Sequence, residues 1–448
     1  MTAPIRVYVY TLGCPKNDAD SHRLTRTLSE RRVELAHDPE EATHLLINTC
    51  AFTQDAKEES IEAILDAVSH YPDRPVLVMG CLVQRYRDDL AAGLPEVTAW
   101  YGLQDTDRLV ADLAAHHSSL DTSFRTPADA HAAGASIEAA GPSAPYGYVK
   151  ISDGCDHGCT FCAIPGIKGP YRALSLRDIE EQAAGYLAEG ACELVLVGQD
   201  TALWSGDGLS LADLVAHLAA DERVARVRLM YMQPENVDAR ILRLLAEDPK
   251  ACRYLDVPFQ HASHEVLARM GRRGDARTHL ELLARARALM PDVSLRSTFI
   301  VGFPGETEKD FRLLLDFVRE ARFDHAGAFL FSPEEGTTAA GLRPRVPRTV
   351  AVERFNRLNA ALEEAGEAAA SARIGRVVDV LIESLDPDED WPEGTVAQGR
   401  TRGQAPEVDG RTFLEGPLLP FARVGQVVGA VITDAIGYDL VAGWHVAP

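Results

Sequence analysis

Short apolar runs alternate with amphipathic stretches along the first third of the chain. The apolar runs are rich in β-branched and aromatic residues, and they cover positions 6–12, 44–48 and 76–79. The stretches between them, 18–30 and 56–68, carry many charges and have apolar residues at helical spacing. Strands that alternate with helices are typical of βαβ units and a parallel sheet. We therefore expect residues 1–126 to form an α/β domain with a parallel sheet.

The same alternation resumes further along the chain. Residues 127–145 are rich in Ala, Gly, Pro and Ser, which predicts a linker. Six strand candidates follow, at 148–151, 193–197, 227–231, 254–257, 294–300 and 326–331. Amphipathic segments such as 175–189, 210–220 and 306–321 separate them. Six such repeats predict a full or partial (β/α) barrel over residues 146–372, with a helix over 350–372 leading out of it.

The pattern changes again at residue 373. Four β-rich runs, at 377–382, 394–402, 412–415 and 427–432, are separated by Gly, Pro and Asp. This pattern predicts a small all-β barrel over residues 373–448. The expected fold class is α/β, with the all-β barrel as a separate third domain.

The charge of the chain bears on its partners. There are 45 Lys and Arg against 67 Asp and Glu, a formal net charge of −22. Residues 1–145 carry 12 basic and 22 acidic residues, residues 146–372 carry 27 and 33, and residues 373–448 carry 6 and 12. Phosphate binding depends on Lys and Arg, so this balance argues against a general polyanion binder. The start of the chain lacks the charged and apolar regions of a signal peptide, and no apolar stretch is long enough to span a membrane. We therefore expect a cytoplasmic protein without membrane contact.

Three cysteines form the sharpest motif. Cys155, Cys159 and Cys162 have C-x3-C-x2-C spacing and follow the first barrel strand, at the end where barrel active sites lie. Thiolates suit an iron–sulfur cluster or zinc. A structural zinc site needs a fourth ligand, for which His157 is available, whereas three ligands to a four-iron cluster leave one iron open. A structural zinc knuckle stays as the alternative to a cluster.

Three further cysteines share a structural context. Cys14, Cys50 and Cys81 each directly follow an apolar run, in the sequences TLGC, INTC and VMGC. Carboxyl ends of neighbouring parallel strands lie side by side, about 4.8 Å apart, so these thiols are expected to converge. Free cysteines are often simply buried, but three in the same position favour a second cluster. Cys192 and Cys252 have no partner at metal spacing, and we expect both in the core.

Other candidate residues also follow barrel strands. Gln199 and Asp200 end the second strand, and Gly302 and Glu306 end the fifth, which makes them candidates for cofactor-binding loops. His261 and His264 follow the fourth strand, and either the barrel mouth or ordinary packing explains them. No side chain is expected to be catalytic by itself.

The whole chain resembles the radical S-adenosylmethionine (SAM) methylthiotransferase family. The resemblance rests on LGCPKN (12–17), NTC (48–50), KISDGCDHGCTFCAIP (150–165), DVPFQHAS (256–263), TFIVGFPGET (298–307) and GRTRGQAPEVDG (399–410). It implies that Cys155, Cys159 and Cys162 hold a 4Fe–4S cluster that binds SAM and cleaves it reductively to a radical. It also implies that Cys14, Cys50 and Cys81 hold a second 4Fe–4S cluster that delivers the sulfur. The terminal barrel resembles a TRAM domain.

The family has two branches, which differ in their substrate. One branch methylthiolates an adenosine in transfer RNA, and the other modifies the β-carbon of an aspartate in small-subunit ribosomal protein S-twelve. Six basic against twelve acidic residues in the terminal barrel suit a basic protein better than RNA. We therefore predict the ribosomal protein as substrate, with transfer RNA as the alternative.

The resemblance also implies partners. These are the ribosomal protein, or the subunit carrying it, and a reductant protein such as flavodoxin or ferredoxin. We expect a monomer. Two non-enzymatic hypotheses compete: a redox-sensing iron–sulfur protein and a zinc-dependent RNA-binding protein.

Overall fold

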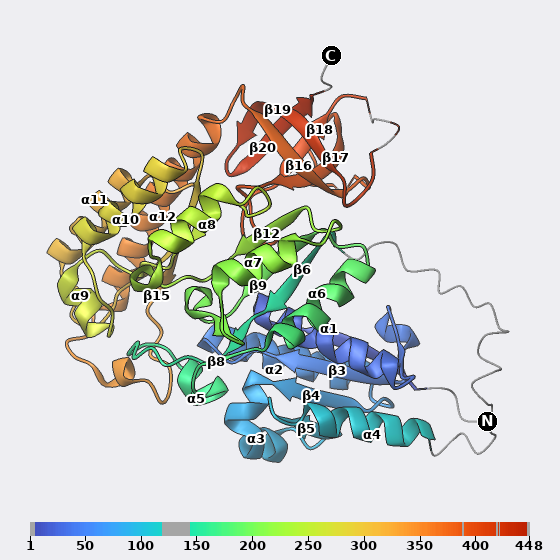
Figure 1. Ribbon diagram of the computed structural model, residues 1–448. Coiled ribbons are helices and arrows are strands. Elements are labelled where there is room, and N and C mark those ends of the chain that lie inside the picture. The colour runs from blue at the N-terminus through green and yellow to red at the C-terminus, as the bar shows by residue number, and fades with distance from the viewer. Residues whose placement is uncertain (1–4, 119–143, 388, 418–419, 421, 446–448) are drawn as a thin grey trace. The chain divides into compact units, whose positions relative to one another are not determined.

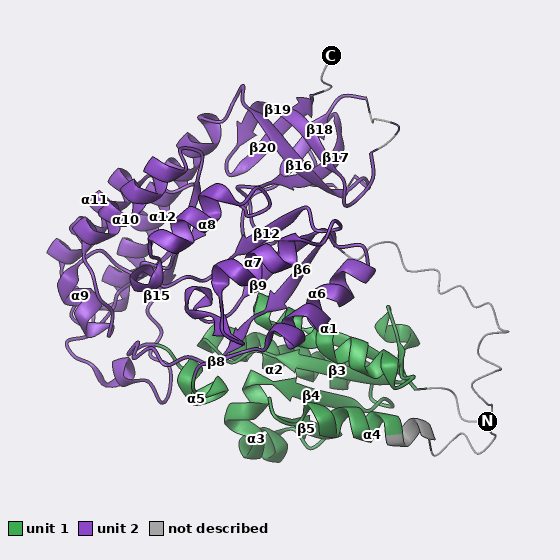
Figure 2. Cartoon of the chain, in the orientation of Figure 1, with its two compact units in different colours: residues 1–140, 162–170 green, residues 141–161, 171–448 purple. Residues whose placement is uncertain are grey.

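The computed structural model describes residues 5–118, 144–387, 389–417, 420 and 422–445 (Figure 1). Two compact units make up the chain, residues 1–140 with 162–170 and residues 141–161 with 171–448 (Figure 2). The predicted linker, 127–145, lies outside the described residues up to position 143. In the described part of the chain, no helix combines the length and the apolar character that a membrane span requires.

The first unit is built on a five-stranded parallel sheet with strand order β2-β1-β3-β4-β5. Its strands are β1 (Arg6–Thr11), β2 (Glu34–Leu35), β3 (His44–Thr49), β4 (Val76–Gly80) and β5 (Ala99–Tyr101). Its α-helices are α1 (Pro15–Glu30), α2 (Gln54–His70), α3 (Cys81–Gly93), α4 (Thr106–Ser118) and α5 (Ile164–Lys168). Leu45 and Ile47 of β3 join one apolar core, and Leu46 joins another. Successive side chains of a strand point to opposite faces, so both faces of this sheet are covered, as the predicted α/β domain requires.

Six parallel strands form an open barrel in the second unit. They lie in two sheets, β12-β9-β6 and β13-β14-β15, which an isolated bridge between Val227 and Ala251 brings together. The strands are β6 (Tyr146–Lys150), β9 (Glu193–Val197), β12 (Arg226–Leu229), β13 (Tyr254–Asp256), β14 (Ser294–Val301) and β15 (His325–Leu330). No pairing joins β15 to β6 among the described residues, so of the two predicted forms the structure shows the partial barrel.

Helices cover the outside of this barrel (Figure 1). They are α6 (Leu176–Ala188), α7 (Leu211–Ala219), α8 (Ala239–Glu247), α9 (His264–Arg269), α10 (Ala276–Leu289), α11 (Glu308–Ala321) and α12 (Arg348–Ser371). Alternate strand residues such as Leu194, Val227 and Leu295 pack in the core beneath the helices. The residues between them therefore face the concave interior, and many are charged or polar. They include Glu193, Arg226, Arg228, Tyr254 and Arg296.

The chain ends in a closed five-stranded barrel with strand order β16-β17-β18-β20-β19. Its strands are β16 (Val377–Ser384), β17 (Thr395–Thr401), β18 (Thr412–Glu415), β19 (Val427–Ile436) and β20 (Asp439–Trp444). The first four match the predicted runs. The fifth, β20, was not predicted, because its sequence DLVAGW begins with Asp and contains Gly near its end, two residues that are depleted in strands.

Residues 400–410, which we call the floor segment, leave the terminal barrel and close the amino-terminal end of the open barrel. Arg226 donates to the carbonyl of Arg400 at 3.0 Å, and Arg228 donates to that of Arg402 at 3.0 Å. Further along the segment, His325 Nε2 bonds to the carbonyl of Gly403 at 2.8 Å. Tyr254 and Tyr146 donate to Asp409 and Glu407, at 2.6 and 2.8 Å. Residues at the amino-terminal ends of strands in both sheets are therefore hydrogen-bonded to the floor segment.

Candidate functional site

The first cysteine set lies at the carboxyl edge of the parallel sheet. Cys50 directly follows β3, Cys81 directly follows β4 and opens α3, and Cys14 stands just before α1, after β1. These three strands are neighbours in the sheet. Burial raises the pKa of Cys81 to about 12, and Cys50 and Cys14 push it in the same direction. Burial likewise raises the pKa of Cys50, and Cys14 adds to that effect. The structure therefore brings the three thiols close enough to interact electrostatically.

Two asparagines hold the cysteine-bearing loops together. Asn17 donates to the carbonyls of Leu12 and Thr49, at 2.8 and 3.2 Å. Asn48 donates to the carbonyl of Asn17 at 3.2 Å and to Ser21 Oγ at 2.9 Å. Both asparagines belong to the motifs that carry the resemblance, three residues after Cys14 and two before Cys50, yet they were not singled out as site residues.

Gly13 allows the two loops to approach. Its φ of +103° is strained for any residue with a side chain, and a Cβ there would lie 2.6 Å from the Cβ of Cys50. A glycine at position 13 therefore lets this loop pack closely against Cys50.

A buried lysine lies beside this cysteine set, and no sequence pattern indicated it. Lys168, at the end of α5, forms an ion pair with Asp20 at 3.3 Å, and both side chains are largely buried. It also lowers the pKa of Cys81, against the effect of burial. Three thiolates carry three negative charges, so a cation at this place stabilises the deprotonated, ligating form.

The second cysteine set follows the first barrel strand. Cys155 and Cys159 lie in the loop after the short strand β7 (Ser152–Asp153), and Cys162 comes three residues later. Burial raises the pKa of Cys155 and of Cys159, and the charge of Cys159 adds to the shift at Cys155. Phe161 stacks edge-on against Phe303, with ring centroids 6.5 Å apart. The aromatic residue of the motif is thus anchored in an apolar cluster of the barrel.

His157, the residue considered as a fourth zinc ligand, is bonded elsewhere. Its Nε2 lies 2.8 Å from Asp200 Oδ2, and this hydrogen bond raises the pKa of the histidine. Asp200 is buried, and it also accepts from Asn236 Nδ2 at 2.6 Å and from the backbone of Gln233 at 3.2 Å. Asp200, predicted as part of a cofactor loop, therefore braces the cysteine loop against the next strand connection.

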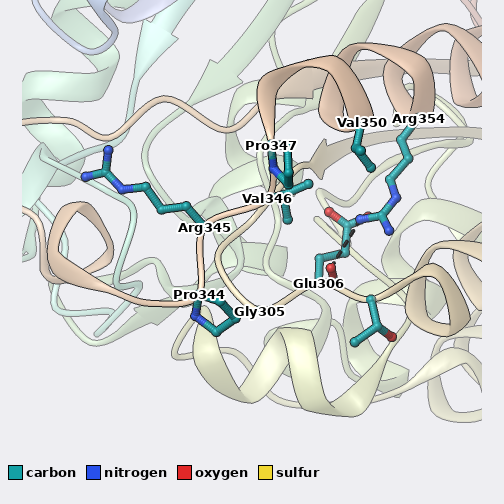
Figure 3. A pocket seen from close by; sticks show the side chains of 9 residues that line it. Gly305, Glu306, Pro344, Arg345, Val346, Pro347, Val350 and Arg354 are labelled. Atoms are coloured by element: carbon teal, nitrogen blue, oxygen red, sulfur yellow. Dashed lines mark hydrogen bonds and ion pairs between the residues drawn. The ribbon is translucent and has the colours of Figure 1, made fainter.

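Glu306, the other predicted carboxylate, braces its own turn. Its Oε2 accepts from the backbone nitrogens of Gly302 and Phe303. Its Oε1 pairs with Arg354 of α12 at 3.4 Å, beside a hollow of about 170 Å³. Figure 3 shows Arg354 reaching the carboxylate of Glu306, whereas Arg345 points away from it. Both predicted loops thus stand at the carboxyl ends of their strands, with the carboxylates engaged in holding backbone.

Three of the remaining candidates are buried, and one is exposed. Cys192 and Cys252 are buried, as expected. His261 is fully buried with its Nε2 3.9 Å from Glu306, and His264 is exposed and bonds to the carbonyl of Gly274 at 3.3 Å.

The donor atoms of the two cysteine sets suit iron–sulfur chemistry. Each set offers three thiols, and thiolates ligate both zinc and iron–sulfur clusters. A structural zinc ion takes four protein ligands, and His157, the candidate fourth ligand of the second set, is hydrogen-bonded to Asp200. Three thiolates leave one iron of a four-iron cluster open, so these residues fit a cluster.

Comparisons with known proteins agree with this division of the chain. Residues 6–102 match the uncharacterised protein family UPF0004, residues 149–318 the radical SAM superfamily, and residues 374–444 the TRAM domain. The fold also resembles a radical SAM methyltransferase, TsrM from Kitasatospora setae, with a TM-score of 0.53 and 15% identity over 75% of this chain and 77% of that one. Along the chain, the radical SAM region with its three-cysteine motif follows the UPF0004 region and precedes the TRAM domain. This order defines a radical SAM enzyme of the methylthiotransferase class.

Relatives of nearly equal length show which methylthiotransferase family the chain belongs to. A protein of Desulforudis audaxviator named ribosomal protein uS12 methylthiotransferase RimO is 40% identical, over 97% of this chain and 96% of its own. Proteins of the same name from Moorella thermoacetica and Acetivibrio thermocellus are 39% and 36% identical, covering 96% and 97% of this chain and 97% of each relative. The chain belongs to the RimO family of methylthiotransferases.

Proposed function

We propose that this enzyme inserts a methylthio group at the β-carbon of an aspartate in small-subunit ribosomal protein uS12. The observation that carries the proposal is the presence of two separate three-cysteine sets in a chain that aligns over almost its full length with RimO proteins. A carbon–sulfur bond at an unactivated carbon needs both a radical source and a sulfur source, and two sites supply one each.

The two sites have different tasks in this proposal. Cys155, Cys159 and Cys162 hold a 4Fe–4S cluster that binds SAM, and Cys14, Cys50 and Cys81 hold a second one. When bound, the clusters supply the reductive cleavage of SAM and the sulfur that is transferred. The protein contributes position, charge and burial. The Asn17 and Asn48 bonds fix the loops that carry Cys14 and Cys50, and the His157–Asp200 bond fixes the loop that carries Cys155 and Cys159.

SAM binds, in our proposal, at the carboxyl ends of β9 and β14. Gln199, Asp200, Gly302 and Glu306 stand there. The carboxylates of Asp200 and Glu306 already accept several hydrogen bonds from the protein, so they shape the loops. We therefore assign direct contact with SAM to the Gln199 and Gly302 segments.

The charge of the terminal barrel favours a basic protein over RNA as the partner. Arg400 is buried, and Arg373 and Arg402 form ion pairs with Asp324 and Asp379. Exposed carboxylates belong to Asp386, Glu389, Asp390, Glu393 and Asp434. Three of the barrel's six arginines thus engage carboxylates or buried groups of the same chain, and the five exposed carboxylates outnumber the other three arginines. Such a surface steers a basic ribosomal protein and repels phosphate.

A gene deletion with two readouts tests the substrate. Deletion should lower the mass of uS12 by one methylthio group and leave the methylthio nucleosides of transfer RNA unchanged. Complementation with the wild-type gene should restore the mass, whereas a C14A/C50A/C81A gene should not. Loss of methylthio nucleosides with unaltered uS12 would instead assign the enzyme to transfer RNA.

A test on the purified enzyme separates the two sites. The reduced C14A/C50A/C81A protein should cleave SAM but insert no sulfur into uS12, whereas C155A/C159A/C162A should do neither. Sulfur insertion by the first variant would overturn the assignment of the second cluster.

We further propose a cytoplasmic monomer that receives electrons from a small reductant protein such as flavodoxin or ferredoxin.

A further inference from the structure

We infer that Arg272 is a positioning residue for the radical SAM cluster, which it stabilises in the reduced state by donating an N–H to the sulfur of Cys159. The inference rests on the proposed function in one respect, namely that Cys155, Cys159 and Cys162 hold an iron–sulfur cluster. It concerns a residue that lies 113 positions away from Cys159 in the sequence.

The guanidinium of Arg272 is placed against the cysteine loop and away from water. Its Nη1 lies 3.9 Å from Cys159 Sγ, and its side chain is only 2% exposed. Its Nη2 donates to the carbonyl of Pro258 at 3.1 Å, which fixes the plane of the group. The only carboxylate paired with Arg272 among the described residues is Glu235, whose Oε2 is 4.0 Å away.

The backbone around Arg272 is joined to the same loop. Thr160 donates from its nitrogen to the carbonyl of Met270 at 2.9 Å, and from its hydroxyl to the carbonyl of Arg269 at 2.8 Å. Gly271 has a φ of +71°, and a Cβ on it would lie 2.3 Å from the carbonyl oxygen of Gly158. The cysteine loop therefore rests directly on residues 269–271, which fixes the backbone beside Arg272 relative to this loop.

Elementary electrostatics gives the direction of the effect. Adding an electron makes a cluster and its thiolates more negative, so a nearby cation and an N–H donor stabilise the reduced state more than the oxidised one. Hydrogen bonds to the sulfurs are one of the means by which proteins set cluster potentials. Burial strengthens both contributions, because little water screens them. Arg272 should therefore raise the reduction potential of this cluster and ease electron transfer to it.

A redox titration of full-length variants, followed by the electron paramagnetic resonance signal that changes when SAM is added, tests the inference. In R272M the reduced-to-oxidised ratio at a fixed potential should fall about tenfold, equivalent to a shift of about −59 mV for a one-electron couple. R272K, which retains a charge but not the planar fork, should give an intermediate shift. R273M is the matched control, because Arg273 is the adjacent arginine and is exposed, and its potential should equal that of the wild type.

Iron and sulfide analysis distinguishes a failure of the proposed cluster from a failure of the proposed role of Arg272. Wild-type protein without iron at this site would contradict the proposed function itself. A loaded R272M cluster with the wild-type potential would overturn the role of Arg272 alone. Loss of the cluster from both R272M and R272K would also overturn it, since lysine retains the charge to which the effect is assigned.

Discussion

Arg400 of the terminal barrel donates to Glu193 at the start of β9, with Nη2 and Oε2 3.0 Å apart, although the two residues are 207 positions apart in sequence. Arg228 occupies the other oxygen of Glu193 at 2.7 Å, and Arg400 also donates to Glu383 at 2.6 Å. The side chains of Glu193 and Arg228 are fully buried, and that of Arg400 is almost fully buried. The terminal barrel is thus held to the open barrel by buried charges.

We expect the E193Q variant to be strongly destabilised. The change leaves Arg228 and Arg400 buried without their shared negative partner, and breaking a buried ion pair in this way costs roughly 3–5 kcal/mol. Denaturant unfolding of the full chain measures the loss. E181Q, which removes a partner of the exposed Arg177, is the control and should leave the unfolding midpoint unchanged. Equal midpoints for E193Q and the wild type would show that the buried network contributes no net stability.

The contribution of Glu193 should depend on pH. Burial by itself would raise its pKa, but Arg228, Arg400 and Arg226 lower it from the ordinary 4.5 to about 2. Because the folded pKa is the lower one, the stabilisation is complete above about pH 4.5 and is lost as the pH falls toward 2.

The difference in unfolding free energy between the wild type and E193Q should therefore be constant from pH 7 to about 5. Below that it should shrink, by up to roughly 3 kcal/mol. Glu383, whose pKa burial raises, has the opposite sign, and the charge of Glu193 adds to that rise. Its contribution is therefore smaller in E193Q and partly offsets the change in the difference. A difference that is flat down to pH 3, measured on protein prepared without iron, would contradict this assignment.

The G271A variant should lose the cluster that we propose at Cys155, Cys159 and Cys162. Its new Cβ would meet the carbonyl of Gly158 at 2.3 Å, and this contact can only be relieved by moving the cysteine loop. Iron content should fall to about half, with SAM cleavage abolished. The matched control is G208A, because Gly208 has a similar φ of +78° but no neighbouring atom within 4 Å of the new Cβ. Full iron content in G271A would show that the loop tolerates the shift.

The K168M variant should bind iron poorly at Cys14, Cys50 and Cys81. The methionine keeps the apolar stem but removes the cation beside Asp20 and Cys81, so the negative charge of the thiolates is no longer balanced. Loss of the charged hydrogen bond to Asp20 should also lower stability by about 1.5–3 kcal/mol. K309M, at an exposed lysine on α11, should change neither quantity. Iron and sulfide content in the C155A/C159A/C162A background isolates the effect; unchanged iron there would exclude a role for Lys168.

Most of the fold could be predicted because its signals are local. The predicted strands at 44–48 and 76–79 are both apolar, and each is followed two residues later by a cysteine. Parallel pairing then places Cys50 beside Cys81 without any long-range information. The C-x3-C-x2-C spacing is local in the same way. Strand β20 was not predicted because its residues have low strand propensity. Its pairing with β18 and β19 in the closed barrel stabilises it instead.

The missed residues are those whose partners lie far away in sequence. Nothing near Arg272 indicates that it donates to Cys159, and nothing near Lys168 indicates Asp20, 148 positions earlier. The motif at 399–410 was noted for its resemblance and for the acidic Glu407 and Asp409. In the structure these carboxylates accept hydrogen bonds from Tyr146 and Tyr254, so their function is to close the barrel.

The floor segment also limits how this architecture can be rearranged. A chimaera that exchanged residues 373–448 for an unrelated nucleic-acid-binding barrel would leave Glu193, Tyr254 and Arg296 facing an open cavity at the base of the catalytic domain. Only a donor barrel with an equivalent loop, carrying its own arginine and carboxylates, would close it. The terminal barrel and the open barrel consequently depend on each other, and the outer surface of the terminal barrel is the part that can change without opening the floor.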